Sequence, residues 1–324
     1  MSCKKKSKKC SSKKKCKGKV NGDIFYTCNA SGSFQIWAIN PAGTNNRQIT
    51  STVDNAIQPA ISPCGKRLSF AGYTGTTIDI YICNVDGTNL INLTKGLAGE
   101  QNTNPSFSKN GKKITFQSNR LNPSAGTTDI WIMKSNGVCQ EAFTPFYPTY
   151  SDIYPKYSPS KKRILFSSNR GSSSLVYDLY LSNNKYFKRV TYNFNNSFSS
   201  SWNPDGKLIV ANQQVNLQDD NVGYGQLTII DTNGKLVKQL TNYTDSEGLT
   251  EFTDTLFPGT YRGDCTPSWS PDGLYVAYAG QDSNSIYQVF IINIATGIKT
   301  QLTSSTTDNN LWVAWQPKSY KNWC

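Results

Sequence analysis

Acidic residues gather in two stretches that interrupt an otherwise regular pattern of short strands. The first lies in a predicted hairpin, and the second in a long insertion at residues 242–263. Paired carboxylates support glycosidase or lyase chemistry, and clustered carboxylates also suit a hard cation such as Ca²⁺. The weak candidates for a metal or catalytic site are Asp219, Asp220, Asp245, Glu247 and Glu251. The simpler interpretation is that these acids are solvated loop residues, so we expect no cofactor other than this candidate Ca²⁺.

The chain lacks the residues that other common catalytic mechanisms require. The chain contains no histidine, which excludes Ser-His-Asp and Cys-His mechanisms and histidine-ligated metals. It has no Gly-x-Ser-x-Gly nucleophile elbow and no Walker-type phosphate loop. We therefore expect a protein that is not an enzyme, with carboxylate catalysis as the one open route.

The insertion at 242–263 is also rich in apolar side chains. A loop of this length must pack on something, and long loops in compact domains often carry function. We predict that it contacts a protein partner or caps one face of the domain. The candidate contact residues are Leu249, Phe252, Phe257 and Tyr261.

The positive charge of the chain is concentrated at its N-terminus. The net charge is +13, of which ten units come from lysines within residues 1–19, leaving +3 for the remainder. Such a run cannot bury a core, so residues 1–20 are predicted to be a flexible tail that binds phosphate through counterion release. The simpler interpretation is a solubilising tail with no specific partner. The candidate tether residues are Lys4, Lys5, Lys6, Lys8, Lys9, Lys13, Lys14, Lys15, Lys17 and Lys19.

The rest of the chain repeats one pattern of four short strands. Each copy opens with an alternating strand that enters a Ser-Pro-x-Gly-Lys type turn, and it closes with an apolar residue followed by Thr. Residues 57–94 are the clearest copy, with the turn at 62–66 and the strand Asp-Ile-Tyr-Ile at 79–82. Pro presets φ and Gly accepts a positive φ, so these turns reverse the chain tightly.

The sixth copy is divided between the two ends of the chain. Residues 311–317 supply its first strand, and residues 23–26, 35–40 and 47–50 supply the other three. Joining the ends in one blade closes a ring and leaves no large exposed sheet edge. The sequence therefore predicts an all-β fold over residues 21–324, a six-bladed β-propeller of four-stranded antiparallel blades.

These motifs resemble the TolB-type β-propeller repeat, a relative of the WD-repeat propellers. The matching segments are Phe-x-Ser-x-Arg at 116–120 and 166–170, Asp-Ile-Tyr at 79–81, Ser-Pro-Asp-Gly at 270–273 and Leu-Thr at 302–303. The same repeat occurs in periplasmic scaffold proteins and beside the catalytic domain of prolyl-oligopeptidase-like hydrolases. The resemblance therefore implies the fold, and it implies function only as a choice between these settings.

Two repeated positions have structural explanations. The end of each first strand carries a large side chain that we expect to pack between neighbouring blades: Ile61, Phe107, Tyr157, Trp202, Trp269 and Trp315. The start of each third strand carries an acid or amide that we expect to hydrogen-bond a neighbouring turn: Asp79, Asp129, Asp178, Gln35, Gln226 and Gln288.

The nine cysteines include no Cys-x-x-Cys pair, and the charged N-terminus has no apolar segment of a secretion signal after it. We therefore expect an intracellular protein with reduced, mostly buried cysteines at Cys28, Cys64, Cys83, Cys139 and Cys265.

The leading hypothesis is an interaction scaffold that recruits proteins while its tail tethers it to nucleic acid or another anionic surface. A structural virion component of a large AT-rich DNA virus is one setting that the composition fits. One alternative is a membrane-peripheral protein whose tail is acylated at Cys3, Cys10 or Cys16. The other is a carbohydrate-active or metal-dependent enzyme that uses the insertion carboxylates.

Overall fold

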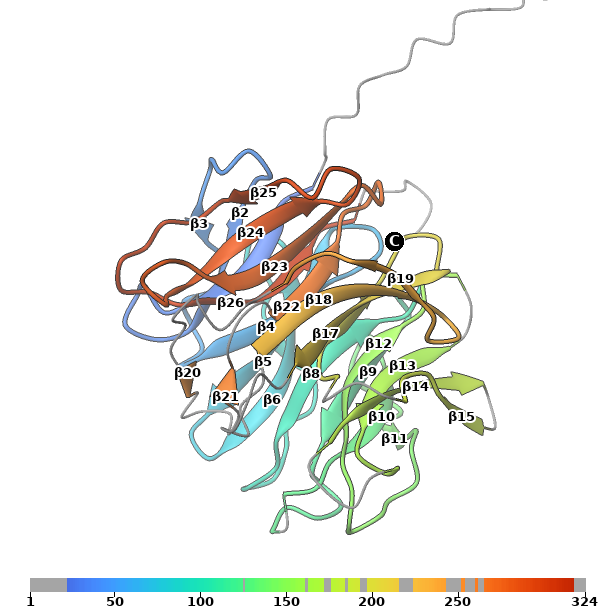
Figure 1. Ribbon diagram of the computed structural model, residues 1–324. Helices are drawn as coiled ribbons and strands as arrows, with labels where there is room; N and C mark the ends of the chain where they lie inside the picture. Colours follow the sequence, from blue (N-terminus) through green and yellow to red (C-terminus); the bar gives the residue numbers. More distant parts are fainter. Residues whose placement is uncertain are drawn as a thin grey trace, which may run out of the picture.

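The computed structural model describes residues 22–124, 126–160, 163–171, 176–183, 186–192, 197–215, 224–242, 252–253, 260–261 and 265–317. These residues form six four-stranded antiparallel sheets and one two-stranded sheet. Figure 1 shows the chain passing from the blue strands β2 and β3 through the green sheets to the red strands β23–β25, which return beside the blue ones. The predicted six-bladed propeller is confirmed.

Each blade uses four strands in chain order, except the last. Blade 1 comprises β4 (Ala56–Ile61), β5 (Arg67–Thr74), β6 (Thr77–Asn84) and β7 (Ile91–Asn92), and blade 2 comprises β8 (Asn102–Phe107), β9 (Lys113–Ser118), β10 (Asp129–Lys134) and β11 (Glu141–Ala142). Blade 3 comprises β12 (Asp152–Tyr157), β13 (Ile164–Ser168), β14 (Asp178–Asn183) and β15 (Tyr186–Arg189), and blade 4 comprises β16 (Ser200–Trp202), β17 (Leu208–Val215), β18 (Tyr224–Asp231) and β19 (Leu236–Gln239). Blade 5 comprises β22 (Cys265–Trp269), β23 (Tyr275–Gln281), β24 (Tyr287–Asn293) and β25 (Lys299–Gln301). The two-stranded sheet pairs β20 (Phe252–Thr253) with β21 (Thr260–Tyr261), inside the long insertion.

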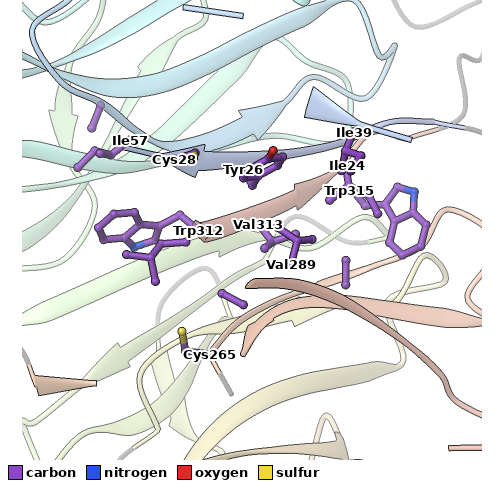
Figure 2. Close-up of a cluster of buried hydrophobic side chains, with 14 of the residues drawn as sticks. Ile24, Tyr26, Cys28, Ile39, Ile57, Cys265, Val289, Trp312, Val313 and Trp315 are labelled. Atoms are coloured by element: carbon purple, nitrogen blue, oxygen red, sulfur yellow. The ribbon is translucent and has the colours of Figure 1, made fainter. Parts of the chain in front are cut away.

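Blade 6 joins the two ends of the chain, as the sequence predicts. Its strand order is β26 (Asn310–Trp315), β1 (Ile24–Cys28), β2 (Gln35–Ile39) and β3 (Arg47–Gln48). In the ladder between β26 and β1, Ile24 lies opposite Trp315 and Cys28 lies opposite Asn310. Figure 2 shows side chains of both strands packed in one buried cluster, which also includes Cys265 and Val289 of blade 5. The ring is therefore closed by a shared core as well as by backbone hydrogen bonds.

The first strands of the blades form the inner wall of the ring. Each contacts the first strand of the next blade, in the cycle β26, β4, β8, β12, β16, β22 and back to β26. These strands therefore line the central channel, and the turns that follow them border one of its mouths.

The closing Thr of each repeat fastens the fourth strand to the third. In every blade its hydroxyl accepts a hydrogen bond from a backbone N–H near the start of the third strand, at 2.9–3.0 Å. The six threonines are Thr50, Thr94, Thr144, Thr191, Thr241 and Thr303. Because a buried N–H without a partner is costly, this bond explains why Thr ends each repeat.

Glycine in the hairpin between the third and fourth strands lets neighbouring blades approach closely. Gly87 has φ +85°, and a Cβ built there would lie 2.2 Å from the backbone oxygen of Ile49 in blade 6. Gly137 and Gly234 repeat this approach, to Leu93 and Val190 of the preceding blades. A side chain at these positions would both strain the backbone and force the blades apart.

Five of the six inner strands carry a β-bulge. The bulged residue is not glycine but adopts φ of +47° to +57°. These residues are Gln58, Asn104, Tyr154, Thr266 and Trp312. A bulge bends its strand, so the channel wall changes direction at this level. Blade 4 has a regular register instead, from Ser200 to Trp202.

The cysteines follow the prediction with one exception. Cys28, Cys83 and Cys265 are reduced and buried, and Cys139 is reduced and exposed. Cys64 is disulfide-bonded, with a partner outside the described residues, so the expectation that it is reduced was wrong. Cys64 lies in the turn after β4, which contacts Gln316 and Pro317 at the other end of the chain. Sequence spacing gives no signal for such a contact between distant segments.

The described residues hold no helix with the length and apolar character needed to cross a membrane.

Candidate binding site in the central channel

One mouth of the central channel widens into a cavity of about 470 Å³, which we call the vestibule. Its wall is made by the second halves of the six inner strands and by the turns that follow them. Each blade contributes a similar set, such as Pro105, Ser106 and Phe107 in blade 2. A much smaller void of about 30 Å³ lies next to it, at the level of the bulges. The vestibule therefore narrows toward the bulged part of the channel.

The six large side chains at the ends of the inner strands all line the vestibule. Their predicted packing between blades is confirmed for Trp202, Trp269 and Trp315, which are at most 7% exposed and belong to three different core clusters. Their second role, as the wall of a cavity, was missed by the sequence interpretation. When the first strand of each repeat is innermost, the residue at the end of that strand lies at the channel mouth in every blade. The sixfold recurrence of a large side chain at this position is therefore the sequence signal that could have predicted the cavity wall.

Serine side chains connect the wall from blade to blade. The backbone N–H of Trp315 donates to the hydroxyl of Ser268 at 2.9 Å. The N–H of Tyr157 donates in the same way to Ser106 at 3.1 Å, across the boundary between blades 2 and 3. These bonds fix the wall residues in place, so the vestibule is a preformed concavity rather than a gap between independent blades.

Lys156 of β12 is the charged residue at the base of this cavity. It lines both the vestibule and the small void beneath it. Burial lowers the pKa of Lys156 to about 8. Lys109, in the turn after β8, is the other charged residue among the described lining, and that lining includes no Asp or Glu. The vestibule is therefore positively charged at its base and largely apolar on its walls.

The predicted hydrogen-bonding role of the third-strand acids is confirmed in two blades. Asp79 accepts hydrogen bonds from Thr94 at 2.6 Å, from Asn92 and from the backbone N–H of Gly96, both at 2.8 Å. Burial raises the pKa of Asp79, but these hydrogen bonds outweigh burial and hold its pKa below the usual value. Asp178 likewise accepts from Thr191 and pairs with Arg189.

Asp129 departs from this pattern. It is 3% exposed, and no hydrogen bond reaches its carboxyl group from the residues that the structure describes. Asp152 lies nearby, fully buried, with one oxygen 2.5 Å from Arg170 and the other without a hydrogen-bond partner. Burial, and next the charge of Asp152, raise the pKa of Asp129 to about 7, while Arg170 lowers it only in part.

Besides the hydrogen bonds that only Asp79 receives, one charge distinguishes the boundary between blades 2 and 3 from that between blades 1 and 2. Asn102 in blade 2 and Asp152 in blade 3 occupy equivalent positions. Each is the first residue of its inner strand, β8 or β12, and each lies opposite the last residue of the following strand, Ser118 or Ser168. Arg120 bonds the Asn102 amide oxygen at 2.7 Å, as Arg170 bonds Asp152. An amide adds no negative charge, so Asp79 is spared the repulsion that Asp129 experiences.

The other predicted site residues belong to the N-terminal tail, the acidic hairpin and the long insertion. The tail lysines, the five insertion acids, Leu249 and Phe257 lie outside the described residues. Phe252 and Tyr261 are opposite each other in the β20–β21 ladder, which shows that the insertion has a hairpin of its own. Among the described residues no group of three His, Cys, Asp or Glu side chains could hold a metal ion.

Comparison with known proteins identifies relatives with the same repeat. No family model matches the chain. The Tol-Pal system protein TolB of Francisella tularensis subsp. mediasiatica is 24% identical over 293 residues, covering 86% of this chain. The chain spans 58% of the length of that relative. A TolB homolog of Chlorobium luteolum is 26% identical over 159 residues, covering 49% of this chain and 34% of the homolog.

Solved structures share the same ring. The crystal structure of TolB from Acinetobacter baumannii matches with a TM-score of 0.71 and 22% identity, over 93% of this chain and 68% of that one. An oligogalacturonate lyase from Vibrio parahaemolyticus matches with a TM-score of 0.54 and 10% identity, over 84% and 86% of the two chains. The fold is thus shared by proteins with different names, and the TolB relatives are also similar to this chain in sequence. Repeat, ring and relatives together show that this chain is a six-bladed β-propeller similar to the TolB proteins.

Proposed function

We propose that the protein is a non-enzymatic scaffold that docks a protein partner on the vestibule face of its propeller. The observation that carries this proposal is the vestibule itself, a concave mouth to which all six blades contribute proline and large apolar side chains. Aromatic and apolar surface inside a polar rim is typical of the centre of a protein interface. The name of the Francisella relative places that relative in the Tol-Pal system, which supports a role in assembly with other proteins.

The tail adds a second element to this proposal. Ten lysines without an acidic residue would hold the scaffold on nucleic acid or another anionic surface, while the propeller recruits its partner. This element is supported by composition alone, as is packaging in a virion.

The docking face is tested by site-specific photocrosslinking on the full chain. One photoreactive residue replaces Asn110, which lies in the turn between β8 and β9 on the vestibule side. The other replaces Leu121, which follows the opposite end of β9. Both positions are exposed and belong to blade 2. We expect a discrete protein adduct from Asn110 and none from Leu121. The same adducts from both positions, or none from Asn110, would refute docking at the vestibule.

The tether is tested separately by binding to duplex DNA, RNA and anionic liposomes across a salt series. Binding that falls steeply with salt and disappears when residues 1–19 are removed supports an electrostatic tether. Binding that survives the truncation would assign the anionic surface to the propeller instead.

A further inference from the structure

Lys156 lacks a compensating charge although it is half-buried at the base of the vestibule. Within the described part of the chain, its ammonium group makes no ion pair and no hydrogen bond. Withdrawing a cation from water without a counterion is costly, and a perturbed titratable group in a cleft is a candidate for a functional site. No Asp or Glu occurs in the described lining of the vestibule, so the described wall supplies no counterion.

The surroundings of Lys156 favour an apolar ligand. Lys156 is followed by Tyr157 in its own strand, and its backbone oxygen accepts a hydrogen bond from the Trp202 indole at 3.2 Å. Trp269 and Trp315 line the same cavity from blades 5 and 6. The cavity volume of about 470 Å³ lies within the usual range of small-molecule sites.

The charge at this site selects the type of anion. One lysine at the base of the cavity balances a single negative charge, and no arginine among the described lining residues offers the paired donors that suit a phosphate dianion. A carboxylate carries one charge at neutral pH and leaves the remainder of the molecule free to contact aromatic walls.

We propose that the vestibule binds a small organic carboxylate, with its carboxylate on the Lys156 ammonium and its apolar body against the tryptophan-lined wall. This site goes beyond the proposed scaffold function, because the ligand requires Lys156 at the base of the cavity, whereas docking of a protein at the mouth does not require that lysine. The two proposals can fail independently, since the crosslinking test at the rim does not depend on Lys156.

Calorimetric titration of the full chain tests the site with three probes. 2-Naphthoate has the proposed chemistry, 2-naphthamide is its neutral match, and inorganic phosphate is an anion without an apolar body. We expect saturable binding of naphthoate, binding of naphthamide that is weaker by about tenfold, and no binding of phosphate. Equal affinity for naphthoate and naphthamide, or no saturable binding of naphthoate, overturns the proposal.

A matched pair of variants locates the site. Lys156→Met removes the charge and keeps the length of the side chain, and we expect it to weaken naphthoate binding by about tenfold. Lys207 is an exposed lysine that does not line the cavity, so Lys207→Met should leave binding unchanged. A Lys156→Met protein that is folded and binds naphthoate as tightly as the original chain refutes the assignment.

The affinity of the unmodified chain for naphthoate, measured as a function of pH, tests the role of Lys156 without a substitution. The titratable groups that line the vestibule and the void are Lys109, Lys156, Tyr154 and Tyr157. Burial raises the pKa of Tyr157, so this group stays neutral over the working range. Affinity for naphthoate should be constant below pH 7 and fall above pH 8, as Lys156 loses its proton. Affinity that stays constant up to pH 9.5 would contradict a role for Lys156.

Discussion

Replacing Asp129 with Asn should stabilise the protein at alkaline pH. The ordinary pKa of an Asp side chain is 3.8, and that of Asp129 in the folded chain is about 7. As pH rises, the unfolded chain releases this proton first, so the folded state loses stability between about pH 4 and pH 7 and then levels off. The shift of about 3 units corresponds to roughly 4 kcal/mol at pH 8, at about 1.36 kcal/mol per unit. Because Asp129 is 3% exposed, solvent screens this effect little.

Asn removes the ionisation and keeps the shape of the side chain. Its NH₂ group could also donate to the buried oxygen of Asp152 that has no partner. We therefore expect Asp129→Asn to raise the free energy of unfolding by up to about 4 kcal/mol at pH 8 and by about 1.5 kcal/mol at pH 5. Urea denaturation at pH 5, 6, 7, 8 and 9 measures both values, and the gain should grow between pH 5 and 7 and stay constant above.

Asp79→Asn is the matched control in the preceding blade. Its carboxylate accepts three hydrogen bonds within 2.8 Å, and its pKa is lowered, so its contribution is present at neutral pH and is lost as pH falls through the folded pKa. This variant should be less stable than the original chain at pH 8. If Asp129→Asn is also destabilised at pH 8, or if its difference from the original chain does not change with pH, the proposed repulsion between Asp129 and Asp152 is wrong.

Three further outcomes test the packing of the ring by urea denaturation. Gly87→Ala should lower the free energy of unfolding by several kcal/mol more than Gly99→Ala. Both glycines have φ near +85°, but an added Cβ meets the backbone of Ile49 at Gly87 and no atom within 4 Å at Gly99. Equal losses would show that the blades can separate freely at Gly87. Trp315→Ala, in the blade that closes the ring, should cost about 3–5 kcal/mol, and a loss below 1 kcal/mol would show that the closure contributes little. Thr191→Val should cost about 1–3 kcal/mol because it leaves the N–H of Leu179 without a partner, whereas no loss would mean that water replaces the hydroxyl.

The repeat made most of the fold predictable. Alternating apolar residues recur in every copy, and Pro, Gly or both occur in the turn after each first strand. Local chemistry therefore sets each blade, and the division of the sixth copy specifies how the ring closes. The sequence shows that a Thr ends each repeat, and the structure explains why: its hydroxyl accepts a hydrogen bond from the backbone of the third strand, as Thr50 does from Ile36. The bulges were not predictable, because Gln58 or Tyr154 in a left-handed conformation is a tertiary outcome that residue type does not signal.

The candidate site was less accessible to sequence reasoning. Lys156 is an ordinary lysine in an alternating strand, and its lack of a counterion is visible only after six strands are arranged around one axis. The role of Asp129 likewise depends on Asp152, which lies on a different blade. The environments of Lys156 and Asp129 are made by residues far apart in the sequence. The acids and lysines predicted as site residues, in contrast, are close together in the sequence.

The shared blade also determines how the protein responds to mechanical load. The chain enters β1 and leaves β26 at the same end of their ladder, where Ile24 faces Trp315. The outermost bonds there join Asp23 and Gln316, at 2.9 and 3.1 Å. A force that pulled the two ends of the chain apart would load these bonds one after another, in an unzipping geometry, instead of shearing the whole ladder at once. A propeller held by its N-terminal segment would therefore keep its ring only while its other end carried no opposing tension.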